Sequence, residues 1–275
     1  MTSPVKVASF AYHEVTDEPA SSGFQRPGAL PYKHSRIAFA QHLAHMSTAP
    51  AMPIAVTNID LSKPGRHVLL TFDDGGKSAL YVADELSARG WTGHFFIVTE
   101  RLGTRGFLRR SEVRHIRALG HVVGSHSHTH PDIFREQSLE QMLFEWHTSA
   151  DLLSQVTGER CETASVPGGH ISPLVVRSAV AAGFTHLFTC EPILSPDRVD
   201  GTWVLGRYLV KAHSPLLRIH ELAQFQGWAS ARVARLMKNA VRRSLPGLYR
   251  QYVWRTTREW PQPHLPVAAE SPPRP

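Results

Sequence analysis

Cysteine is scarce in this chain, and its scarcity excludes two kinds of structure. The 275 residues contain two cysteines, Cys161 and Cys190. Two residues are too few for a disulfide framework, and they lack the paired spacing of a zinc knuckle. We expect both to be buried as small apolar side chains.

Long apolar runs are also missing. No segment reaches the ~18 apolar residues of a membrane span, and residues 1–11 lack the basic and apolar regions of a secretory signal. We therefore expect a soluble protein that is made without export and is located in the cytoplasm.

Acidic residues are absent between Leu222 and Arg258, where basic residues recur among large apolar ones. This pattern predicts basic amphipathic helices over residues 221–258, interrupted near Pro246. An anionic membrane surface at the inner face of the membrane, or a lipid-phosphate substrate, is the partner that such helices would suit. The alternative is a helix that packs on the domain and keeps a solvated basic face. We expect no nucleic-acid partner, because no zinc finger, RNA-recognition or helix-turn-helix pattern accompanies the charge. Residues 259–275 are rich in proline and are predicted to be disordered.

Over residues 1–220, strand-like apolar runs alternate with helical stretches, which predicts a single α/β barrel or open parallel sheet. The chain is long enough for one such core plus an appendage. The predicted strands are 5–12, 68–72, 94–98, 121–124, 165–167 and 186–190. The predicted helices are 37–46, 79–89, 111–119 with Ser111 as N-cap, 139–156 and 173–182. Reactive groups of such folds lie at the carboxyl ends of the strands.

Two adjacent carboxylates follow one buried strand. Asp73 and Asp74 come directly after residues 68–72, and Gly75 lets the chain turn sharply behind them. Two like charges at a buried strand end repel each other unless a cation lies between them. The pair therefore predicts a metal ion.

A histidine pair follows another strand. His126 and His130 lie in a polar segment closed by Pro131, which prevents a regular helix from continuing there. With 17 histidines in the chain the spacing alone is weak, but its position after a strand favours metal ligation. His128 is expected to point away.

These segments carry a resemblance. Residues 71–75 (TFDDG), 125–131 (SHSHTHP) and 165–169 (SVPGG) resemble three motifs of the polysaccharide deacetylase family, carbohydrate esterase family 4. The resemblance implies a distorted, incomplete (β/α) barrel that removes acetyl groups from N-acetylated sugars with one divalent metal ion. It implies that Asp74, His126 and His130 bind this ion and that Asp73 is the general base. Zn²⁺ fits this ligand set best, and Co²⁺, Ni²⁺, Mn²⁺ or Fe²⁺ would also fit.

The third motif departs from the family pattern. Many members begin it with an arginine that pairs with the catalytic aspartate, and this chain has Ser165 instead. Arg207 is the candidate for the missing cation, with an ordinary surface arginine as the alternative. Gly168, Gly169 and Arg207 are candidate substrate contacts.

The general acid is also displaced in sequence. No Leu-x-His motif stands on a late strand, whereas an apolar run leads directly to His13. This arrangement resembles a circularly permuted branch of the family, in which the last strand has moved to the front. His13 would then protonate the departing amine; the alternative is a strand-end histidine bonded to a carbonyl.

The resemblance therefore predicts a metal-dependent carbohydrate N-deacetylase. The lack of an export signal and the basic C-terminal segment lead to the further hypothesis that it acts at the inner membrane face in surface polysaccharide synthesis. Two alternatives stay open: a metal amidohydrolase of the same fold that acts on a non-sugar amide, and a catalytically silent barrel that binds glycan or lipid.

Overall fold

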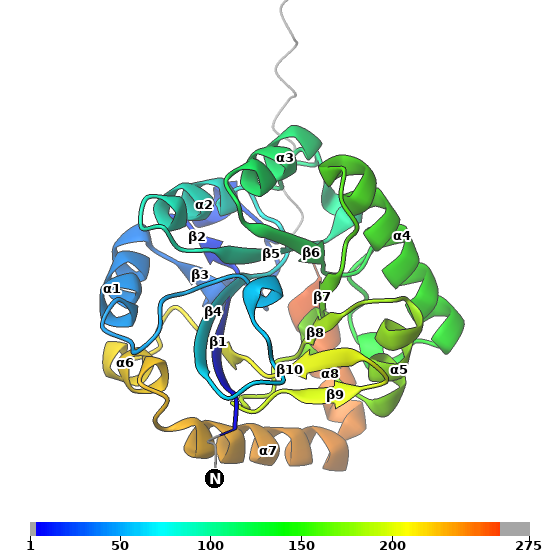
Figure 1. Cartoon of the computed structure of the whole chain (residues 1–275). Coiled ribbons are helices and arrows are strands. Elements are labelled where there is room, and N and C mark those ends of the chain that lie inside the picture. Colours follow the sequence, from blue (N-terminus) through cyan, green and yellow to red (C-terminus); the bar gives the residue numbers. More distant parts are fainter. Residues whose placement is uncertain (1–3, 259–275) are drawn as a thin grey trace, which may run out of the picture.

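The apolar runs of the sequence form the strands of one curled nine-stranded sheet, seen in a computed structural model that describes residues 4–258 (Figure 1). Its strand order is β11-β1-β4-β5-β6-β7-β8-β10-β9. The strands are β1 (Lys6–Tyr12), β4 (Arg66–Phe72), β5 (Gly93–Ile97), β6 (Val122–Ser125), β7 (Thr163–Ser165), β8 (His186–Phe188), β9 (Asp197–Val199), β10 (Thr202–Leu205) and β11 (Tyr208–Leu209). A second, two-stranded sheet pairs β2 (Glu14–Val15) with β3 (Lys33–His34).

All neighbouring strands of the large sheet are parallel except β9 and β10, which are antiparallel. The strands β9 and β11 are the two edges, so the sheet curls without closing. The predicted incomplete barrel is confirmed.

Helices surround the sheet in an outer ring (Figure 1). They are α1 (Arg36–Met46), α2 (Ala79–Ser87), α3 (Arg110–Ala118), α4 (Leu139–Thr157), α5 (Pro173–Ala181), α6 (Leu216–Ala223), α7 (Trp228–Ser244) and α8 (Pro246–Thr257). Short 3-10 turns occupy Pro19–Ser21, Leu30–Tyr32, Val56–Asn58, Thr99–Arg101, Phe134–Glu136 and Pro167–Gly169. The five helices predicted within the barrel all form, within a few residues of their expected ends.

One predicted helix cap is wrong. Helix α3 has Arg109, not Ser111, as its N-cap residue. The reason is Glu112, whose carboxylate accepts a hydrogen bond from the backbone N–H of Arg109 at 2.7 Å and so satisfies the first turn from within the helix.

The side chains of the central strands alternate between two hydrophobic layers. On β4, Leu70 packs in the large layer under the helices, whereas Leu69 packs in a small layer inside the barrel. Continuing the period of two carries Thr71 and Asp73 to the inner face. Leu205 on β10 belongs to the inner layer as well, and Arg207 follows it two residues later.

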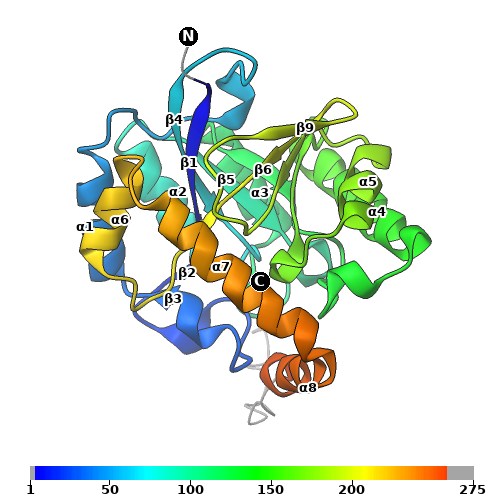
Figure 2. The ribbon, with the colours of Figure 1, turned by 90° about the horizontal axis from the view of Figure 1, so that it is seen from below.

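The basic C-terminal segment packs on the barrel. The predicted boundary at residue 221 falls within α6. Trp228 of α7 is buried with its ring 6.1 Å from that of Phe10 on β1, and Val253 of α8 is also buried. Figure 2 shows α7 running from beside α6 to α8. The predicted tail 259–275 lies outside the described residues.

Candidate active site

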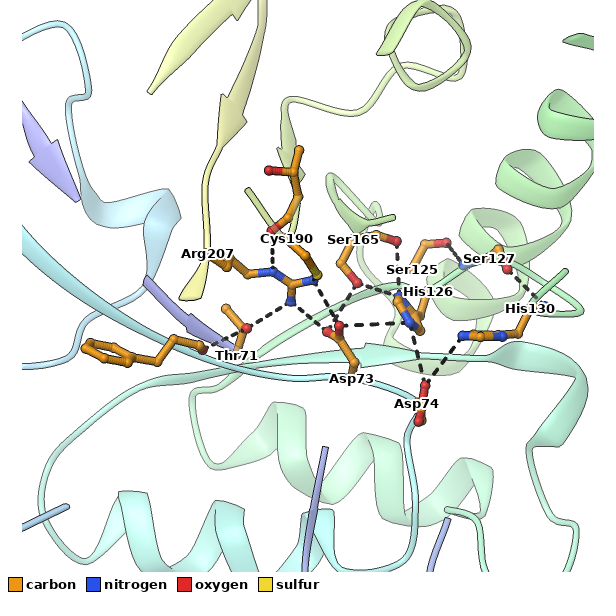
Figure 3. Close-up of polar contacts among 12 residues, drawn as sticks. Thr71, Asp73, Asp74, Ser125, His126, Ser127, His130, Ser165, Cys190 and Arg207 are labelled. Carbon is orange, nitrogen blue, oxygen red and sulfur yellow. Dashed lines mark hydrogen bonds and ion pairs between the residues drawn. The ribbon is translucent and has the colours of Figure 1, made fainter. Parts of the chain in front are cut away.

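The carboxylate of Asp73 is held by the guanidinium of Arg207. Two hydrogen bonds join them: Arg207 Nη1 donates to Asp73 Oδ1 at 2.7 Å, and Arg207 Nη2 donates to Asp73 Oδ2 at 2.9 Å (Figure 3). Arg207 also donates to Thr189 O and to the hydroxyl of Thr71, and it is completely buried. Arg207 therefore supplies the cation that Ser165 cannot, and it is placed to orient Asp73 rather than to contact a substrate.

Burial and the neighbouring cation act oppositely on Asp73. Burial alone would raise the pKa of its carboxyl group, but the charge of Arg207, followed by that of His126, lowers the pKa to about 2. Asp73 is thus an ionised acid at neutral pH although it is only 3% exposed.

Three further groups converge beside it. Asp74 leaves the end of β4, and His126 and His130 follow β6, so that their ligand atoms lie within 4.8 Å of one another. The Nε2 atoms of His126 and His130 are 3.6 and 3.8 Å from Asp74 Oδ1. Asp74 and His130 both adopt positive φ angles, of 77° and 58°, which aim their side chains at a common point at some cost in backbone strain.

Ser165 joins this group to Asp73. The Ser165 hydroxyl donates to Asp73 Oδ1 at 3.2 Å and lies 2.5 Å from His126 Nδ1, which also faces the Ser165 carbonyl at 3.1 Å (Figure 3). A carbonyl can only accept, so His126 carries its proton on Nδ1, and the lone pair of Nε2 is directed towards Asp74.

The donor set fits a divalent cation. Asp74 Oδ1 is buried and has no hydrogen-bond partner among residues 4–258, and burial raises the pKa of its carboxyl group. Burial lowers the pKa of His126 and of His130, so both imidazoles are neutral, as metal ligands must be. A cation beside these atoms would satisfy the buried carboxylate oxygen.

One contact competes with such a cation. Arg26 Nη2 lies 3.1 Å from His130 Nδ1, and because an arginine only donates, this contact places the His130 proton on Nε2. Metal binding through Nε2 therefore requires Arg26 to release His130. Asp132, whose carboxylate is 3.5 Å from Arg26, is its second partner.

His13 follows β1 and lines the same cavity as Asp74 and His130. Its ring stacks on Tyr32, with centroids 4.9 Å apart, and its Nδ1 has no hydrogen-bond partner within the described chain. Burial lowers the pKa of His13, and the charge of Asp73 opposes this shift. The predicted alternative, a bond to a nearby carbonyl, is not seen for Nδ1.

The two glycines of the third motif differ. Gly168 lines the cavity, whereas the N–H of Gly169 donates to Val166 O and its carbonyl accepts from Arg235. Of the two, only Gly168 is placed to meet a substrate.

Several cavity residues were not found from the sequence. They come from the irregular segment between β2 and β3 and from the last two helices: Phe24, Arg26, Tyr32, Lys238, Arg242, Tyr249 and Tyr252. His170 is buried and its Nε2 lies 2.6 Å from the Tyr249 hydroxyl, a contact across 79 positions that no local pattern signals.

Comparison with known families agrees with this geometry. Residues 60–187 match a family model described as polysaccharide deacetylase. This part of the chain is a polysaccharide deacetylase domain. It contains Asp73, Asp74, His126, His130 and the third motif, whereas His13 and Arg207 lie outside the matched residues.

Solved structures of similar fold cover most of the chain at low identity. The deacetylase PplD of Streptococcus pyogenes, in complex with acetate, is 17% identical with a TM-score of 0.66 and covers 79% of this chain and 97% of its own. IcaB from Ammonifex degensii is 20% identical with a TM-score of 0.65, and the match covers 81% of this chain and 98% of IcaB. A de-N-acetylase from Aggregatibacter actinomycetemcomitans is 17% identical with a TM-score of 0.64, and the match covers 79% of this chain and 99% of that protein. No curated protein matches the chain significantly.

Among the described residues, none of the helices combines the length and apolar character that crossing a membrane requires.

Proposed function

We propose that this protein is a metal-dependent carbohydrate deacetylase that removes the acetyl group from an N-acetylated amino sugar. One observation carries the proposal: Asp73, kept ionised by a dedicated buried arginine, lies beside the converging ligand atoms of Asp74, His126 and His130. A hydrolase needs both an ion site and a separate base, and this arrangement contains both.

Asp74, His126 and His130 would hold the ion. Three protein ligands leave coordination positions open, so a bound divalent ion would acidify a water molecule and polarise the acetyl carbonyl. Zn²⁺ is the ion that we propose, since two imidazoles and one carboxylate are typical of catalytic zinc sites; Co²⁺, Ni²⁺, Mn²⁺ and Fe²⁺ accept the same donors.

Asp73 would accept the proton of the attacking water. Its carboxylate is 3.9 Å from the Nε2 atom of the proposed ligand His126, so a water held there would be within its reach. Arg207 keeps the carboxylate ionised and in one orientation. A carboxylate with a pKa of about 2 is a weak base, so the reaction depends on a strongly acidified water.

His13 would then protonate the amine that leaves. It lines the cavity with two proposed ligands. Burial lowers the pKa of His13, so its ring is neutral in the free enzyme, and it would pass to the amine the proton that Asp73 takes from the water. The position of β1 between β11 and β4 brings this N-terminal histidine to the carboxyl ends of the central strands. A circular permutation of the family fold would account for this order.

The geometry favours an enzyme over a silent binding barrel. A barrel that only binds glycan or a metal needs no second acid, yet Asp73 is bonded by Arg207 and Ser165 at the ion site. The class of amide is tested directly by comparing N-acetylglucosamine oligomers with small linear and cyclic amides.

The decisive experiment is acetate release by the wild type and by Asp73→Asn. Replacing the base should lower kcat by about 10²- to 10⁴-fold while the bound metal content stays unchanged. Asp151→Asn, an exposed position on α4, is the matched control and should keep full activity. Bound metal without acetate release from any acetylated sugar would contradict the proposal.

We also propose that the protein works at the cytoplasmic face of a membrane in surface polysaccharide synthesis. Helices α7 and α8 expose apolar side chains between basic ones: Val233, Leu236, Met237, Leu248 and Trp254 are all at least half exposed. This composition suits the surface of an anionic bilayer. Sedimentation with phosphatidylglycerol vesicles, but not with phosphatidylcholine vesicles, is expected for the wild type and should weaken in Leu236→Ser/Met237→Ser. Equal recovery with both vesicles would contradict membrane binding.

A further inference from the structure

Helices α7 and α8 form one wall of the cavity that holds the candidate active site. Asp74 and His130 line this cavity together with Lys238 and Arg242 of α7 and Tyr249 of α8. A molecule bound at the proposed metal ligands therefore also faces the basic side chains of α7.

The barrel-facing stripe of α7 changes from apolar to basic along the helix. Trp228 and Ala231 are buried at its start, Arg235 contacts the loop after β8, and Lys238 and Arg242 reach the cavity. Intervals of three or four residues place all five on one side of the helix. The basic residues over the cavity therefore take positions at which a helix that merely packs on a domain would carry apolar ones.

The opposite side of α7 strengthens this reading. Val233, Leu236 and Met237 are 57%, 52% and 66% exposed, so α7 presents apolar side chains to solvent, whereas Arg242 and the exposed Lys238 line the cavity. A surface helix selected only for packing shows the reverse distribution. The inward basic residues therefore need an explanation other than solubility.

The two α7 cations that line the cavity have no acidic partner in the described part of the chain. Glu191 is already bonded to Arg235 at 2.9 Å and to Asn239 at 3.2 Å. Within residues 4–258, Lys238 and Arg242 form no ion pair with a carboxylate. Partial burial is the main cause that lowers the pKa of Lys238 to about 8, and the neighbouring charges of Arg242, Lys211 and Arg235 lower it further.

Arg242 is held in place by aromatic contacts. Its guanidinium lies 4.9 Å from the centroid of the Tyr249 ring, and the Tyr249 hydroxyl is bonded to His170. Arg242 and Lys238 lie about one helical turn apart on α7, and both line the cavity. This combination suits an anion with several acceptor oxygens.

We propose that the substrate carries an anionic group, a phosphate or a carboxylate, next to its N-acetylated sugar, and that Lys238 and Arg242 bind this group. The inference rests on the proposed function, because it names the substrate class of the same site. The substrate is thus a sugar phosphate or an acidic oligosaccharide rather than a neutral glycan.

The test measures equilibrium binding, which does not depend on turnover. Glucosamine, glucosamine 1-phosphate and a glucosamine–glucuronic acid disaccharide are titrated calorimetrically into the full-length wild type loaded with Zn²⁺. At least one anionic probe should bind about tenfold or more tightly than glucosamine, and the stronger of the two identifies the group as phosphate or carboxylate. Equal affinity for all three probes would overturn the proposal.

Substitutions on α7 test which residues bind the anionic group. Lys238→Gln and Arg242→Gln should each weaken binding of the preferred anionic probe by about tenfold and leave glucosamine binding unchanged. Arg232→Gln, an exposed residue on the same helix, is the matched control and should bind like the wild type. An equal loss in all three variants would indicate a general charge effect and would refute a site at Lys238 and Arg242.

Acetate release separates the two proposals. Absence of acetate from N-acetylglucosamine, its oligomers and its 1-phosphate would refute the deacetylase activity, and with it the substrate class. The titrations would then still decide whether an anion site exists. Acetate release from both compounds with equal kcat/KM, together with equal binding of the probes, would refute the anion site and leave the proposed function standing.

Discussion

At the scale of single residues, the ion pair of Asp73 and Arg207 determines the charge of the candidate site. Both side chains are essentially removed from solvent, at 2% and 0% exposure. Such a pair contributes little net stability as a unit, but removing one partner leaves the other charge buried and uncompensated.

Arg207→Met should therefore be strongly destabilising. We expect the free energy of unfolding to fall by about 3–5 kcal/mol, measured by denaturant titration of the metal-free protein at pH 7.5. Asp73→Asn/Arg207→Met should lose less than the sum of the two single changes, because no charge is stranded in it. Additive losses would mean that the two side chains are not coupled.

Arg207→Met should also reverse the effect that protonation of Asp73 has on the stability of the fold. In the wild type the pKa of Asp73 lies below its ordinary value, so the ionised carboxylate stabilises the fold, and this contribution is lost as the pH falls from about 4 to about 2. In Arg207→Met, burial acts without the arginine and raises the pKa, so protonation stabilises the variant. The stability gap between wild type and variant should narrow as the pH falls from 7.5 towards 4. A gap that widens over this range would contradict the assignment.

The sequence predicted site residues correctly where a local motif carried residue types that suit one kind of chemistry. Local motifs identified the adjacent carboxylates of Asp73 and Asp74 and the histidines His126 and His130. The structure brings these four side chains together. Arg207 was named as a candidate for the missing cation, but a lone arginine 134 positions from Asp73 carries no local signal of this contact. Only the inner-face alternation of β4 and β10 explains the contact.

At the scale of elements, the connection from β10 to β11 positions Arg207. Gly206 lies so close to the loop after β8 that an added Cβ atom would meet Glu191 O at 2.4 Å and Ile193 O at 2.5 Å. These are backbone atoms that cannot turn away. The absence of a side chain at Gly206 is what lets the two loops meet over Asp73.

Gly206→Ala should therefore shift this connection and displace Arg207. We expect a loss of about 1–3 kcal/mol in stability and a fall in acetate release that exceeds what the lost folded fraction explains. Gly247→Ala is the matched control, since no atom lies within 4 Å of its added Cβ and helix α8 favours alanine. Equal behaviour of the two variants in denaturant titration and activity would contradict this role for Gly206.

The helices and strands were predicted better than the tertiary contacts between them. Apolar runs such as 68–72 and helices such as α4, which is capped by Ser138 and Gly158, follow local rules of periodicity and capping. The cavity wall does not follow from such local rules. The contact of Tyr249 with His170 joins two parts of the chain that only the tertiary fold brings together. The basic stretch 221–258 was seen in the sequence, but not which of its cations face inward.

At the scale of the whole molecule, the proposed metal ligands connect two central strands of an unclosed sheet. Asp74 follows β4, and His126 and His130 follow β6, with β5 between the two strands. An ion bound there would cross-link the middle of the barrel. Without it, the Asp74 carboxylate is buried with one unpartnered oxygen, which destabilises the fold.

Metal loading should therefore raise the thermal midpoint of the whole barrel. At free Zn²⁺ about 100-fold above Kd, linkage gives about 2.7 kcal/mol, or a shift of about 5–10 °C for a chain of this size. A chelator should reverse the shift, as measured by differential scanning calorimetry.

Two variants identify the ligands independently of activity. Asp74→Asn should abolish the Zn²⁺-dependent shift, yet its metal-free form should melt no lower than the metal-free wild type, because the substitution removes a buried charge. His128→Gln should keep the shift, since His128 lies between the two histidines but its Nδ1 contacts Thr99 at 2.9 Å instead of facing Asp74. A full Zn²⁺ shift in Asp74→Asn would place the ion elsewhere in the chain, and the base, the acid and the anion-binding wall would then have no common centre.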